Sequence, residues 1–84
     1  MTAPGIGHRI LALLDEHESL AYEQIAAHLN EPPDDVRDAL SRLRGIGLVE
    51  ALAAGELHAH TTRAVAYWRL TYVGREEAAR LREQ

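Results

Sequence analysis

The chain has 84 residues, 46% of them hydrophobic and 26% charged, which suits one small globular core and excludes a disordered composition. It contains no cysteine, so a disulfide framework, a thiolate nucleophile and a cysteine-based zinc site are excluded. Thirteen acidic residues against nine arginines give a net charge of −4, a balance that does not by itself favour a nucleic-acid partner.

Two helices are expected in the N-terminal third of the chain. Apolar residues at helical spacing predict the first helix from residue 7 to 17, and the residues that set its apolar face are Ile6, Ile10, Leu13 and Leu14. A short joint at Ser19 and Leu20, which can adopt extended backbone, separates it from a second helix at 21–29. The apolar side of the second helix carries Ile25, Ala26 and Leu29.

A third helix is predicted to begin at a double proline. The sequence Asn30-Glu31-Pro32-Pro33 stops the second helix, because a residue before proline is held in extended backbone. Pro33 suits the first position of a new helix, and Asp34 and Asp35 match the exposed amides of its first turn. The inward residues are then Val36, Ala39, Leu40 and Leu43. We expect the helix to run to about residue 44–46, with Gly47 as a left-handed C-terminal cap.

The rest of the chain predicts a two-stranded ribbon and a last helix. Strands are expected at 48–53 and 64–71, and the connection at 54–63 is too long for a tight turn. Arg69 can pair with Glu50 across this ribbon, and Thr71 can cap a helix at 72–82. The predicted fold class is therefore mostly α with a small antiparallel β wing, in a single domain spanning residues 1–84.

This order of elements resembles the winged helix-turn-helix domain of transcriptional regulators of the MarR and PadR kind. Four stretches carry the resemblance, namely residues 20–29, residues 36–43 followed by Gly47-Leu48-Val49, residues 67–71 and residues 74–76. The resemblance implies a sequence-specific DNA-binding regulator. Its helix at 34–46 would enter the major groove, and its wing at 54–63 would touch the DNA backbone or the minor groove.

The positions that the resemblance places against double-stranded DNA are both basic and acidic. They are Asp34, Asp35, Arg37, Asp38, Ser41, Arg42 and Arg44 on the helix and Arg63 on the wing. Arg37 can pair with guanine, or it can instead form an ion pair with Asp34 or Asp38. Arg63 is either a DNA contact or a solvated loop charge. Because aspartates repel phosphate, the alternative function is a protein-docking module whose acidic third helix binds a basic partner protein.

The resemblance also suggests how two copies could associate. Relatives usually carry proline and an acid where this chain has Tyr72 and Val73, and both of these residues are apolar. We therefore expect a homodimer, with an interface drawn from Tyr72, Val73, Ala78 and Leu81. The alternative is that Tyr72 folds back onto the first helix, against Ile6 and Ile10.

The remaining signals are weak. His58 and His60 could hold a metal only with a third ligand, so no metal or cofactor is predicted, although the two side chains could gain charge near pH 6. No phosphate loop and no nucleophile–base set is present, so no enzyme is expected. No apolar run approaches the roughly 20 residues of a membrane span, and no secretory signal is seen, which indicates a soluble, cytoplasmic chain without a membrane partner.

Overall fold

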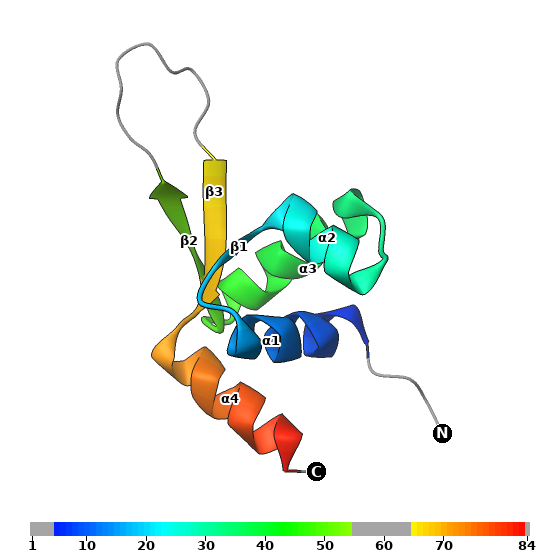
Figure 1. Ribbon diagram of the computed structural model, residues 1–84. Helices are drawn as coiled ribbons and strands as arrows, with labels where there is room; N and C mark the ends of the chain where they lie inside the picture. Colours follow the sequence, from blue (N-terminus) through cyan, green and yellow to red (C-terminus); the bar gives the residue numbers. More distant parts are fainter. Residues whose placement is uncertain (1–4, 55–64, 84) are drawn as a thin grey trace.

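The computed structural model describes residues 5–54 and 65–83. Its elements, in chain order, are α1 (Ile6–Glu16), β1 (Leu20–Ala21), α2 (Tyr22–Leu29), α3 (Pro33–Gly45), β2 (Val49–Ala54), β3 (Val65–Leu70) and α4 (Tyr72–Arg82). The predicted fold class, a mostly helical winged helix-turn-helix, is confirmed (Figure 1). No helix boundary differs from the expected one by more than one residue. The residues expected at the wing tip, including Arg63, His58 and His60, lie outside the described residues.

The sheet has three antiparallel strands in the order β1-β3-β2. The joint predicted at Ser19 and Leu20 leads into a short strand, β1, in which Leu20 lies opposite Trp68. On the other side of β3, Glu50 lies opposite Arg69. The central strand β3 therefore ties the start of the second helix to the ribbon, a pairing that no local sequence signal predicted.

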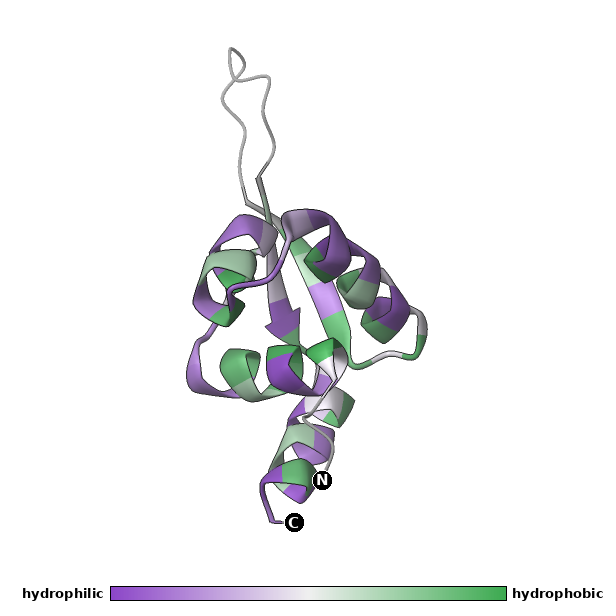
Figure 2. Cartoon of the chain, turned by 90° about the vertical axis from the view of Figure 1, so that its right-hand side faces the viewer, coloured by the Kyte–Doolittle hydropathy of each residue, from purple (hydrophilic) through white to green (hydrophobic). Residues whose placement is uncertain are grey.

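One hydrophobic core joins the three N-terminal helices to the sheet and to α4. Its largest fully buried side chains are Ile10, Ile25, Val36, Leu40 and Val49. In the hydropathy view, green apolar residues turn toward the space between the helices, whereas much of the outward surface is purple (Figure 2). The inward face predicted for α3 is confirmed in full. Leu11 on α1 is also buried, outside the apolar face predicted for that helix.

The ends of α2 and α3 use the same backbone device. In each, a residue with positive φ follows the helix, namely Asn30 at 57° and Gly47 at 82°. After α3, the amide of Leu48 donates to the carbonyl of Leu43 and the amide of Gly47 donates to the carbonyl of Arg44, the two bonds of a Schellman motif. This confirms Gly47 as the left-handed cap and sends the chain directly into β2.

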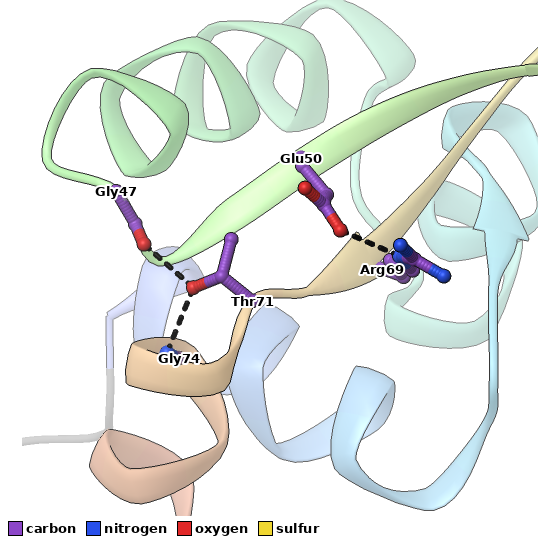
Figure 3. Close-up of polar contacts among 5 residues, drawn as sticks. All are labelled: Gly47, Glu50, Arg69, Thr71 and Gly74. Atoms are coloured by element: carbon purple, nitrogen blue, oxygen red, sulfur yellow. Dashed lines mark hydrogen bonds and ion pairs between the residues drawn. The ribbon is translucent and has the colours of Figure 1, made fainter.

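A single threonine joins the end of α3 to the start of α4. The Thr71 hydroxyl donates to the carbonyl oxygen of Gly47 at 2.6 Å and accepts from the amide of Gly74 at 3.0 Å (Figure 3). The Thr71 amide also donates to the carbonyl oxygen of Leu48, at 3.0 Å. Thr71 is therefore the N-terminal cap of α4, as predicted, and also holds the segment after α3 in place.

The same junction requires a glycine at position 74. A Cβ atom added to Gly74 would lie 1.9 Å from the carbonyl oxygen of Leu48, far inside van der Waals contact. Because that oxygen belongs to backbone that Thr71 also holds, it cannot move away without disturbing the junction. The first turn of α4 thus packs directly on the backbone that links α3 to β2.

We predict that Gly74→Ala lowers the free energy of unfolding by about 2–3 kcal/mol, because the new methyl group overpacks the junction. Gly45→Ala is the matched control. No atom lies within 4 Å of a Cβ placed there, so stability should stay unchanged or rise by up to about 1 kcal/mol. Urea unfolding followed by circular dichroism measures both, and equal effects of the two substitutions would contradict the packing described.

A second prediction concerns the threonine itself. Thr71→Ala removes the cap of α4 and the bond to Gly47, and should lower the free energy of unfolding by about 1–2 kcal/mol. Thr71→Ser keeps the hydroxyl and should stay close to wild type. If the serine and alanine variants unfold at the same urea concentration, the hydroxyl is not what stabilises the junction.

Candidate nucleic-acid interface

The outer face of α3 is the surface that the fold leaves open. Its inner side is buried in the core, whereas every polar residue along it is exposed. The exposed set comprises Asp34, Asp35, Arg37, Asp38, Ser41, Arg42 and Arg44. The helix positions that sequence reasoning assigned to DNA therefore all face solvent on one element.

Charge is divided along this helix. Acidic residues occupy its first turn and basic residues its last. Both placements stabilise the helix, because each charge is opposite in sign to the end of the helix dipole beside it. The expectation that Asp34 and Asp35 stabilise the helix terminus is consistent with this placement. A partner with a negative charge would therefore meet repulsion at the N-terminal end of α3 and attraction at its C-terminal end.

Arg37 sits in the acidic half and is held there by two groups. Its Nη2 atom donates to Oδ1 of Asp34 at 2.9 Å, which is the intrahelical ion pair considered from the sequence. Its Cζ atom also lies over the Tyr22 ring, 5.7 Å from the ring centroid. That distance is within the range of a cation–π interaction. The side chains of Arg37 and Asp34 remain 58% and 84% exposed.

The other arginines separate into paired and unpaired ones. Within residues 5–54 and 65–83, ion pairs occupy Arg9, Arg37, Arg69, Arg80 and Arg82. The predicted pair across the ribbon is present, with Nε of Arg69 2.6 Å from Oε2 of Glu50 (Figure 3). In that same part of the chain, two of the three arginines without an ion pair, Arg42 and Arg44, lie on α3.

Two of these pairs connect elements far apart in the sequence. Arg9 on α1 donates to the carbonyl oxygen of Leu29 at 2.6 Å and to Oε2 of Glu31 at 2.5 Å. It thereby holds the turn between α2 and α3. Arg82 near the end of α4 donates to Oδ2 of Asp15 on α1, also at 2.5 Å. Neither pair had a signal in the sequence, because each depends on how the helices pack.

No metal centre is formed by the described residues. His17 and His28, which the sequence left without a role, come together with ring centroids 5.3 Å apart. Across the described ranges, however, no three His, Asp or Glu side chains are grouped so that they could hold a metal ion. No helix in the same residues is long and apolar enough to cross a membrane.

The start of α4 exposes apolar surface. Tyr72 is 75% exposed and Val73 is 54% exposed, so the alternative in which Tyr72 folds back onto α1 is wrong. Ile46, which directly follows α3, is 69% exposed and was not singled out from the sequence. Ala78 must be removed from the predicted dimer interface because it is buried in this chain's own core, and Leu81 also packs partly against that core.

Comparisons with known proteins find the same fold in other solved structures. A mutant of Lactococcus lactis ZitR in apo form superposes with a TM-score of 0.78 at 26% identity, over 93% of this chain and 55% of that chain. Streptococcus pneumoniae FabT in complex with DNA gives 0.78 at 16% identity, over 92% and 50%. The MarR family transcriptional regulator SPO1453 of Silicibacter pomeroyi gives 0.74 at 20% identity, over 93% and 51%.

These matches concern the fold and about half of each neighbour. The chain spans roughly half the length of the solved structures it matches. No protein-family model matches the sequence, and no curated protein matches it. The resemblance expected from the sequence is confirmed at the level of the fold, because the structures that share it include the MarR family transcriptional regulator SPO1453 and the Streptococcus pyogenes adhesin competence repressor AdcR.

Proposed function

We propose that the chain is a sequence-specific DNA-binding transcriptional regulator that acts in the cytoplasm and places α3 in the major groove. The observation that carries this proposal is the free outer face of α3, where Arg42 and Arg44 have no ion-pair partner among the described residues. The fold is shared with a solved structure that contains DNA, which supports the same assignment. Arginine is the residue best suited to both guanine edges and phosphates.

The residues divide into different roles within this proposal. Arg37 and Ser41 lie where a helix reaches base edges, and Arg42 and Arg44 lie where it approaches the phosphate backbone. Arg63, outside the described residues, would add a contact from the wing. The exposed carboxylates of Asp34 and Asp38 work against affinity, although an aspartate can accept a hydrogen bond from N4 of cytosine.

The charge count predicts binding that depends only weakly on salt for a DNA-binding protein. If each copy neutralises about three phosphates, the logarithm of the binding constant should fall against the logarithm of salt concentration with a slope of about −3. We expect duplex binding at low ionic strength, measured by fluorescence anisotropy on random-sequence DNA. Absence of binding at low salt would refute the proposal.

The contribution of the free arginines can be tested in the same assay. Arg42→Ala combined with Arg44→Ala should weaken binding to all duplexes and make the salt slope less steep by about 2. Arg69→Gln combined with Arg80→Gln is the control, because these two arginines are paired with Glu50 and Glu77 and the substitutions remove the same number of positive charges. An equal loss in the control would mean that only total charge matters.

A second function is favoured by one observation, the exposed acidic half of α3. Asp35 and Asp38 have no arginine partner in the described part of the chain, so they are open to a basic protein. Arg37→Ala should abolish DNA binding only if the first function is correct. Asp34→Lys combined with Asp38→Lys should abolish capture of a basic protein only if the second is correct.

We also propose that two copies associate through the start of α4. Tyr72 and Val73 expose apolar side chains that a second copy would cover, in keeping with the expected homodimer. Tyr72→Ser combined with Val73→Ser should shift the sedimentation coefficient to that of a monomer. Ala27→Ser, a polar change at an exposed position on α2, should leave it unchanged. A wild-type monomer at micromolar concentration would overturn this proposal.

A further inference from the structure

We propose that Tyr22 positions Arg37 for guanine and that Asp34 competes with the nucleic acid for the same guanidinium. Together the two residues would make Arg37 a contact that forms fully only on a G·C base pair. This inference rests on the proposed DNA-binding function and adds a specificity determinant on α2. It assigns Tyr22 a role that neither its type nor its sequence position indicated.

Tyr22 is a fixed platform. It is the first residue of α2, and its half-buried side chain packs against the hydrophobic core. The backbone there is anchored by β1 and by the Gln24 side chain, whose Oε1 accepts from the amide of Ala21 at 2.8 Å. A long arginine side chain over such a ring loses rotamer freedom before any ligand arrives. Its N–H donors remain at the edge of the guanidinium plane.

Asp34 holds the same guanidinium by one weak contact. A single nitrogen–oxygen distance of 2.9 Å joins the two side chains, and both are more than half exposed. An exposed pair of this kind contributes little, since solvent screens it and both side chains must be ordered. A two-point contact with a base is stronger than such a pair, so a suitable base can displace the carboxylate.

The exchange favours guanine over the other bases. Guanine presents two acceptors, O6 and N7, side by side in the major groove, and these match two donors of the guanidinium. Adenine presents one acceptor beside a donor, so Arg37 would gain one bond there while Asp34 still competes. A base must therefore bind Arg37 more strongly than Asp34 does. Because Tyr22 fixes the position of the guanidinium, only a base with two acceptors side by side meets this condition.

The test uses duplexes selected by the wild-type protein from a random pool, each then altered from G·C to A·T one pair at a time. We expect Tyr22→Leu to reduce discrimination at one G·C pair about fivefold to tenfold with an unchanged salt slope. Tyr22→Phe keeps the ring and should behave as wild type. Arg37→Lys keeps the charge but not the two-donor geometry, and should lose discrimination at the same pair.

The competitor role has its own matched control. Asp34→Asn and Asp35→Asn remove the same charge from the same helical turn, but of these two carboxylates only that of Asp34 is paired with Arg37. Both should raise affinity by reducing repulsion, and Asp34→Asn should raise it about threefold more. Asp34→Asn should also reduce the difference in affinity between duplexes that carry G·C and duplexes that carry A·T at the base pair that Arg37 contacts.

A readout without DNA checks the geometry directly. The Nε–H resonance of Arg37 should carry a ring-current shift that Tyr22→Leu removes and Tyr22→Phe retains. An unchanged resonance in Tyr22→Leu, full discrimination in that variant, or equal effects of Asp34→Asn and Asp35→Asn would overturn the inference while wild-type DNA binding stands. No duplex binding by the wild type would instead overturn the proposed function, and this inference with it.

Discussion

The contact on which the arrangement of this molecule depends is the meeting of Thr71 and Gly74 with the backbone after α3. One hydroxyl satisfies a carbonyl on one element and an amide on another, and a missing side chain lets the backbones touch. The direction of α3, the start of the ribbon and the start of α4 are consequently fixed at one point. The exposed face of α3 takes no part in this junction, so it is open to a partner.

The arginines show how an acidic chain can still present a basic surface. Most of those in the described ranges are neutralised by carboxylates from neighbouring turns, strands or helices. Arg42 and Arg44, on the last turn of α3, are not neutralised in this way, and the acidic residues of that helix lie toward its other end. What matters to a polyanion is this local distribution, since screening in salt makes distant charges count for little.

Local signals predicted the elements well, whereas most contacts between separate elements, apart from the ion pair between Glu50 and Arg69, were not predicted. The double proline, Gly47 and Thr71 each act through backbone within a few residues, so their effects could be inferred from the sequence. The strand at Leu20, the position of Tyr22 under Arg37 and the burial of Ala78 depend on packing between separate elements. For the same reason, the charged residues of the site could be predicted from the sequence, but the contact between the Tyr22 ring and Arg37 could not.

The contacts of Arg9 with the turn after α2 make α1 a link between separate parts of the molecule. The Arg9 guanidinium donates hydrogen bonds to the turn between α2 and α3. At the opposite end of α1, Asp15 forms an ion pair with Arg82 on α4. The first helix therefore contacts both the last helix and the turn of the helix-turn-helix. A displacement of α4 relative to α1 would therefore break the ion pair between Asp15 and Arg82.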